Sequence, residues 1–368
     1  MKKPEFIRKP FLTLAVVVLV AAAIFYIESQ KPKIDINKNI EENNPNSAYP
    51  RAPDFAGIEK WINSEPLKIE QLRGKVVLVD FWTYTCINCI RTLPYLKDWD
   101  KKYRDEGLVI VGVHTPEFEF EKKYENVLKA VNDYQLKYAV AQDNNYVTWN
   151  LYQNRYWPHK FLIDIDGYIR YDHIGEGAYE ETEMMIQALL KERMERLNKK
   201  DGIKLNITKP SELPEFQKID TPEIYFGYQF SRGNFGNPEG IKSGQVIDYR
   251  FPLSITQNNV YFEGKWRNNA DNMELVSDDG SILLIFDAKK ANIVAGSESG
   301  STAFVFLDNE FESEKNKGND VFIQQNKSVA KINEFKLYNI VNAENYDTHV
   351  VQIDVVGKGF KIYTFTFG

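Results

Sequence analysis

The stretch that decides the fold is FWTYTCINCIRTLPYL, residues 81–96, which holds both cysteines of the 368-residue chain. The pattern predicts a buried strand for KVVLVDFW, residues 75–82, and a helix from Cys86 to about Arg104. Cys86 then lies at a helix N-terminus, where unpaired backbone N–H groups and the helix dipole favour a thiolate. Cys89 lies one turn further in and can attack a mixed disulfide formed by Cys86. We therefore expect Cys86 to be the nucleophile and Cys89 the resolving thiol.

Two other interpretations of the cysteine pair remain open at this point. A zinc site needs four ligands, so two histidines would have to converge on the cysteines. Two inert buried thiols are the default for cysteines in a core, but the strand and helix around this pair argue against it. The chain has four histidines, which are His114, His159, His173 and His349.

Strands and helices alternate from residue 51 to residue 197, which predicts an α/β sheet covered on both faces. A second strand is predicted at Leu108–Thr115, and a charged helix at Glu180–Leu197 closes the unit. Between them, Asp166-Gly167 indicates a hairpin turn.

The pattern changes after residue 197. Residues 198–220 are rich in charge and proline, so we interpret them as a linker. Residues 221–368 contain many short strands separated by Asn, Gly, Asp and Ser, which predicts an all-β sandwich resembling a jelly roll. Because the linker offers few apolar residues for rigid docking, we expect the two domains to be separable.

The N-terminus carries basic residues before an uncharged run from Phe11 to Ile27. This arrangement predicts a membrane anchor within residues 1–28, with the N-terminus in the cytoplasm and the remaining domains outside. A cleaved signal peptide with a site at Ala21-Ala22-Ala23 is the alternative. Residues 29–50 are polar and Asn-rich, which predicts a disordered tether.

The segment VLVDFWTYTCINC resembles the active-site strand and turn of the thioredoxin fold, in the extracytoplasmic branch that includes TlpA-like and DipZ-like thiol-disulfide proteins. The resemblance implies that Asp80 relays a proton to and from Cys89. It also implies that Pro158 is a cis-proline facing the cysteines and that the Trp157 backbone pairs with a substrate peptide. The redox-active pair Cys86–Cys89 would be the only redox centre, with no separate cofactor and no metal.

The resemblance extends to the C-terminus, where TPEIYFGY and the closing YTFTFG are similar to the β-domain of DipZ-type proteins, a module likened to carbohydrate-binding domains. It implies a polysaccharide as a further partner of this domain. Tyr225, Tyr261 and Trp266 could stack on sugar rings, although aromatic residues in sandwiches are usually core. One N-terminal helix replaces the multi-helix segment of DipZ proteins, so electrons would come from a separate membrane protein of the CcdA or DsbD type.

The function that this pattern favours is a membrane-anchored extracytoplasmic thiol:disulfide oxidoreductase that reduces client protein disulfides, with cytochrome c maturation as one role. A net charge of −6 gives no reason to expect a nucleic-acid partner. A peroxiredoxin-like peroxidase is the alternative suggested by Thr83, although Val79 stands where that family has proline. A non-catalytic cell-surface binding protein is another. His114 and Glu117 follow a strand end near the cysteines, where they could tune Cys86 or be solvated bystanders.

Overall fold

The computed structural model describes residues 48–199, 202–210 and 219–368, and residues 51–368 form one compact unit. The predicted anchor at 1–28, most of the tether at 29–50 and part of the linker at 198–220 lie outside the described residues. In the part of the chain that the structure describes, no helix is both long enough and apolar enough to cross a membrane.

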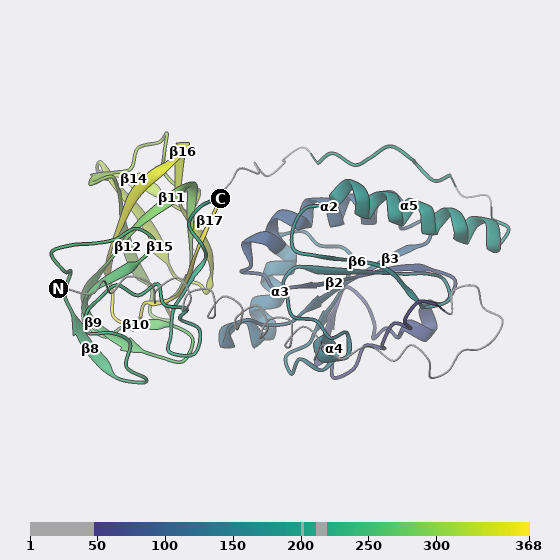
Figure 1. Cartoon of the computed structure of the whole chain (residues 1–368), viewed down its shortest axis with the longest axis horizontal. Helices are drawn as coiled ribbons and strands as arrows, with labels where there is room; N and C mark the ends of the chain where they lie inside the picture. The colour runs from purple at the N-terminus through teal and green to yellow at the C-terminus, as the bar shows by residue number, and fades with distance from the viewer. Residues whose placement is uncertain (1–47, 200–201, 211–218) are drawn as a thin grey trace, which may run out of the picture. The chain divides into compact units, whose positions relative to one another are not determined.

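A six-stranded sheet with the order β1-β4-β3-β2-β5-β6 is the centre of residues 51–197 (Figure 1). Its central strand β2 pairs in parallel with β3 and antiparallel with β5, and β5 and β6 form the hairpin predicted at Asp166-Gly167. The predicted strands at 75–82 and 108–115 are confirmed. The strands are β1 (Lys60–Ile62), β2 (Val76–Trp82), β3 (Leu108–His114), β4 (Ala139–Gln142), β5 (His159–Ile163) and β6 (Ile169–Ile174).

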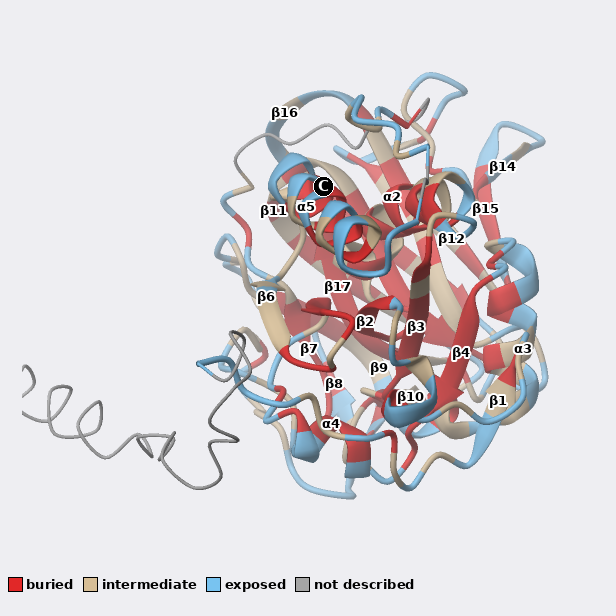
Figure 2. Cartoon of the chain, turned by 90° about the vertical axis from the view of Figure 1, so that its right-hand side faces the viewer, coloured by how far each residue is buried: buried red, intermediate tan, exposed pale blue. Residues whose placement is uncertain are grey.

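Helices cover both faces of this sheet because the side chains of β2 alternate between two cores. Leu78 and Trp82 belong to a core with α2, α3 and α5, whereas Val79 and Phe81 belong to a core with α4 and the segment before β2. Figure 2 shows the central strands as buried. The helices are α2 (Ile87–Tyr103), α3 (Tyr124–Asp133), α4 (Val147–Leu151) and α5 (Tyr179–Arg196), with 3₁₀ turns η1 (Ile69–Leu72) and η2 (Glu119–Lys122).

Residues 221–368 form a large antiparallel β-sheet domain, in agreement with the all-β prediction. Its longest strands are bent: β11 pairs with β9 along its first part and with β17 along its second part. The strands are β7 (Ile224–Tyr225), β8 (Val246–Tyr249), β9 (Val260–Asn268), β10 (Met273–Leu275), β11 (Asp279–Gly296), β12 (Ser301–Leu307), β13 (Glu310–Phe311), β14 (Phe322–Gln324), β15 (Lys327–Ile332), β16 (Lys336–Val356) and β17 (Lys361–Phe367).

The aromatic residues considered for sugar stacking are buried, so that part of the sequence interpretation is wrong. Trp266 is 0% exposed, Tyr261 is 3% exposed and Tyr225 is 8% exposed. Trp266 packs with Phe262 inside the β-domain, and the Tyr261 hydroxyl bonds to Thr256. Trp266 belongs to the core of the β-domain, Tyr225 belongs to a cluster that also contains residues of α2, and the Tyr261 ring lies against Gly236.

The two domains contribute side chains to one hydrophobic cluster, a contact that the linker does not indicate; that the first domain can be separated from the second stays a prediction. Tyr225, Val294 and Tyr363 of the β-domain belong to the same buried cluster as Leu93 and Leu96 of α2. The sequence argument considered only the linker, whereas the docking residues come from strands β7, β11 and β17.

Candidate active site

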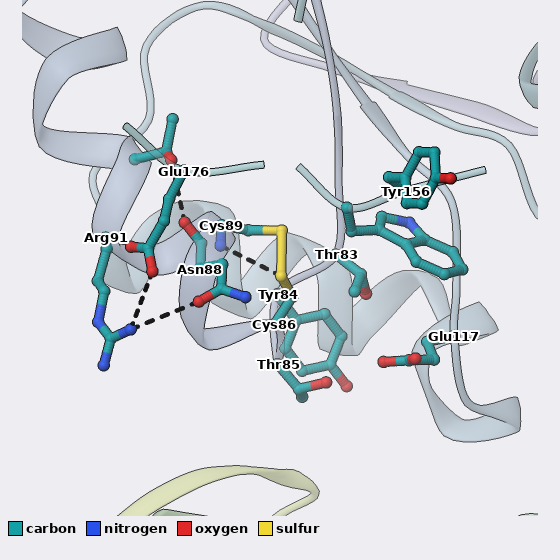
Figure 3. Close-up of a disulfide and its surroundings, with 12 residues drawn as sticks. Thr83, Tyr84, Thr85, Cys86, Asn88, Cys89, Arg91, Glu117, Tyr156 and Glu176 are labelled. Atoms are coloured by element: carbon teal, nitrogen blue, oxygen red, sulfur yellow. Dashed lines mark hydrogen bonds and ion pairs between the residues drawn. A yellow bond between two sulfur atoms is a disulfide. The ribbon is translucent and has the colours of Figure 1, made fainter. Parts of the chain in front are cut away.

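The cysteine pair lies where β2 passes into α2, as predicted. Cys86 is the N-cap of α2, and its Sγ accepts a hydrogen bond of 3.1 Å from the backbone N–H of Cys89. The two cysteines form a disulfide (Figure 3). Cys86 is half-buried, and Cys89 is 1% exposed. A client can therefore reach Cys86 more readily than Cys89, and a thiolate on Cys86 would be stabilised by the helix N-terminus.

Asp80 lies on β2, on the face that carries α2. It is 1% exposed, and its Oδ1 atom has no hydrogen-bond partner among the described residues. Burial raises the pKa of Asp80 from 3.8 to about 7, and the positive charge of Lys160 opposes this rise. A carboxyl group with such a pKa can take up and release a proton near neutral pH.

Lys160 is a residue of the site to which the sequence analysis assigned no role. It lies on β5 directly opposite Asp80 in the antiparallel register, and it is 0% exposed. Its Nζ donates a hydrogen bond of 3.1 Å to the carbonyl oxygen of Gly175. Burial lowers the pKa of Lys160, and the charge of Asp80 opposes that change. The signal in the sequence is a lysine inside the apolar strand that follows Pro158.

Trp157 and Pro158 precede β5, and the peptide bond between them is cis, as the family resemblance implied. The Pro158 carbonyl accepts a hydrogen bond of 2.8 Å from the N–H of Gly175. The Trp157 indole is held by a hydrogen bond of 3.0 Å to the carbonyl of Thr115 and by the ring of Trp149. Within residues 48–199, 202–210 and 219–368, no hydrogen bond engages the backbone N–H or C=O of Trp157.

A buried carboxyl group holds the loop in front of Cys86. The Thr85 hydroxyl donates a hydrogen bond of 2.6 Å to Oε1 of Glu121, which is 0% exposed. The Oε2 atom of Glu121 accepts hydrogen bonds from the N–H groups of Glu117 and Phe118, at 2.6 and 3.0 Å. Burial raises the pKa of Glu121, and hydrogen bonds from Thr83, Thr85 and these N–H groups oppose the rise.

His114 is a core residue, so its interpretation as a solvated bystander is wrong. It is 0% exposed, its ring stacks on Tyr84, and its Nε2 lies 3.3 Å from the Thr83 hydroxyl. Burial lowers the pKa of His114 to about 3, so the ring is neutral at physiological pH. Thr83, on which the peroxidase alternative rests, is thus buried beside His114.

Glu117 is half-buried and is one of the residues drawn around the disulfide in Figure 3. Burial raises the pKa of Glu117 to about 8, and the charges of Glu121 and Glu223 add to the rise. A hydrogen bond from Tyr225 and the charge of Arg232 oppose it. Three of these neighbours belong to the β-domain, which therefore contributes to the electrostatics of the site.

The described residues contain no group of three or more His, Cys, Asp or Glu side chains that could hold a metal ion. Both cysteine sulfurs are bonded to each other. His159 instead bonds to Asn154 and Asp172, and His349 bonds to Asp308.

Comparison with known proteins agrees with the two-domain organisation. Residues 74–169 match a family model described as "Thioredoxin-like", and residues 221–368 match one described as "Thioredoxin like C-terminal domain". Protein DipZ of Mycobacterium bovis is 38% identical over 250 residues, which cover 67% of this chain and 35% of DipZ. The chain thus spans about a third of the length of that relative.

Two further similarities each cover 38% of the chain. The thiol-disulfide oxidoreductase ResA of Bacillus cereus is 30% identical over 138 residues, which cover 38% of this chain and 76% of ResA. A crystal structure of a thiol-disulfide isomerase from Corynebacterium glutamicum aligns with 38% of this chain and 96% of its own, with 24% identity and a TM-score of 0.34.

Proposed function

The chain belongs to the family of thioredoxin-like thiol-disulfide oxidoreductases, and we propose that it reduces disulfide bonds of client proteins through Cys86 and Cys89. One observation carries the proposal. The half-buried Cys86 caps the N-terminus of α2, while Cys89 is buried one turn behind it.

The reaction starts from the dithiol form. The Cys86 thiolate attacks one sulfur of the client disulfide, and the other client sulfur leaves as a thiolate that takes a proton from water. Cys89 then loses its proton and attacks the Cys86 sulfur of the mixed disulfide, which releases the second client sulfur as a thiolate that also takes a proton from water. The client gains two electrons and two protons, and the chain ends as the Cys86–Cys89 disulfide.

Asp80 accepts the proton of Cys89 in the second step and is the proton relay of the reaction. Its buried position and its raised pKa support this role, because a carboxyl group that titrates near neutral pH matches such a transfer. Trp157 presents its unbonded backbone N–H and C=O to a client segment, and Pro158 fixes that edge beside the disulfide.

Trapping of mixed disulfides tests the proposal. Cys89→Ser should accumulate a covalent complex with a disulfide-containing protein such as insulin, because the second attack is blocked. Cys86→Ser should form none, and non-reducing electrophoresis distinguishes the two. If both variants trapped clients equally, or if the wild-type dithiol did not reduce insulin, the proposal would be wrong.

We further propose that the enzyme is anchored by residues 1–28 with both domains outside the cytoplasmic membrane. The basic residues before the apolar run Phe11–Ile27 support this orientation. A separate membrane protein of the CcdA or DsbD type would return two electrons to the disulfide, and apocytochrome c is one client. Membrane-impermeant maleimide should label Cys86 of Cys89→Ser in intact cells after reduction; labelling only after lysis would contradict the orientation.

A further inference from the structure

The loop in front of Cys86 is buried, and its central residue, Tyr84, is covered by the β-domain. Thr83, Tyr84 and Thr85 are 0%, 4% and 1% exposed, although they form a loop at a functional site. Tyr84 lies in the shared core that includes Tyr363, and its hydroxyl donates to the Phe335 carbonyl at 3.4 Å. The β-domain therefore reaches to within two residues of the reactive cysteine.

The contact itself is a layer of aromatic rings. Phe118 and Phe120, in the loop after β3, pack on Tyr363 of β17 with ring centroids 5.1 and 4.7 Å apart. Phe120 also packs on Phe335, at 5.2 Å. Rings of this kind supply large contact areas with defined geometry, so the layer holds the β-domain at a fixed place beside the redox loop.

A polar contact holds the other side of the redox helix. Arg91, two residues after Cys89, donates through Nη2 to the carbonyl oxygen of Phe367 at 3.0 Å. Its Nη1 pairs with Glu176 at 3.2 Å (Figure 3). The last strand of the β-domain is thus bonded to the first turns of α2, in addition to its contact with Tyr84.

The remaining approach to Cys86 lies along Tyr156 and Trp157. Tyr156 is 51% exposed, and Figure 3 places it among the residues around the disulfide. Next to it, the backbone N–H and C=O groups of Trp157 make no hydrogen bond within the described residues and form an open edge. An extended polypeptide can lie along this edge, because it needs only a narrow path and pairs through its own main chain.

From these contacts we infer that the β-domain is one wall of the redox site and that this wall selects disulfides carried on an extended polypeptide segment. A disulfide within a folded surface meets the wall before its sulfur reaches Cys86. Phe335 and Tyr363 are the specificity-determining residues of the wall. This inference rests on the proposed function, since it concerns which disulfides that same pair reduces.

The test compares one disulfide loop in two settings, as a free peptide and grafted on the surface of a folded carrier protein. The reduced wild-type full chain should reduce the free peptide at least tenfold faster. Phe335→Asp places a charge in the aromatic layer and should lower this preference at least threefold, mainly by faster reduction of the grafted loop. Phe335→Ala, which removes the ring without adding a charge, should lower the preference in the same direction, and an unchanged preference in this variant would overturn the inference if Phe335→Asp does not fold.

Phe306→Asp is the matched control. Phe306 is a half-buried phenylalanine of the same domain, and its ring stacks on Phe311 rather than on the redox domain. This variant should keep the wild-type preference. Equal rates for both substrates in the wild type would overturn the inference, as would wild-type preference in a folded Phe335→Asp protein. Loss of all turnover in the wild type would instead refute the proposed function.

Discussion

Replacing Asp80 by asparagine should change how the stability of the protein depends on pH. Burial raises the pKa of Asp80 from 3.8 to about 7, so folding favours its protonated form. The stabilisation from this group is complete below pH 3.8 and is lost as the pH rises through about 7. One pKa unit corresponds to about 1.4 kcal/mol, so the total loss is about 4 kcal/mol.

Part of the stabilisation from Asp80 is already lost at pH 5, because the aspartate side chain is ionised at this pH when the protein is unfolded. The linkage relation predicts that the ionisation of Asp80 lowers the free energy of unfolding by about 2 to 3 kcal/mol between pH 5 and pH 8. The asparagine variant lacks this loss. Relative to wild type, the free energy of unfolding of Asp80→Asn should therefore rise by about 2 to 3 kcal/mol when the pH is changed from 5 to 8.

Urea unfolding of the oxidised protein, followed by tryptophan fluorescence at both pH values, measures this difference, and the disulfide keeps the cysteines from titrating. Asp100→Asn is the control, since Asp100 is buried on α2 but is bonded to Arg104. It should lower the free energy of unfolding by similar amounts at both pH values. A pH-dependent change below about 0.5 kcal/mol for Asp80→Asn would refute a raised pKa for this carboxyl group.

Three more predictions concern the same site. Lys160→Met removes the cation that opposes the raised pKa of Asp80, so the pH-dependent loss of stability should move to higher pH in the same unfolding assay. If the dependence of stability on pH stayed as in wild type, Lys160 would not influence the pKa of Asp80. Glu117→Gln should flatten the fall in the free energy of unfolding between about pH 4.5 and pH 8, because burial raises the pKa of Glu117 to about 8 and the wild type loses that stabilisation as the pH rises; a fall as steep as in wild type would contradict this. In the reduced protein, iodoacetamide at pH 6 should alkylate Cys86 well before Cys89, as read by mass spectrometry, and equal labelling would contradict the assignment of the nucleophile.

The parts of the fold that the sequence predicted well depend on local patterns. A nearly continuous apolar run predicted β2, and the cysteine pair predicted the start of α2, because both signals lie within one element and its boundary. The hairpin at Asp166-Gly167 was likewise predictable from turn chemistry alone.

The features that the sequence did not reveal depend on pairing between distant segments. Lys160 lies opposite Asp80 because of the register in which β5 pairs with β2, and no local sequence pattern specifies this register. Phe335 and Tyr363 look like ordinary strand aromatics, and their sequence gives no sign that they pack against Phe120. His114 lies at the end of the predicted strand, and its ring is buried by Tyr84 and Thr83 of the neighbouring segment, which the strand pattern alone does not indicate.

The shared aromatic layer also has a consequence for folding during synthesis of the chain. Phe120 and Tyr363 are about 240 residues apart in the chain, so at a synthesis rate of roughly 5 to 20 residues per second about 10 to 50 seconds separate their appearance. During that interval the first domain can form its sheet while Phe118 and Phe120 lack their partners in the β-domain. A newly made chain thus exposes an apolar face beside a reactive cysteine until its last strand is made. Its biogenesis is therefore expected to depend on factors that shield such surfaces.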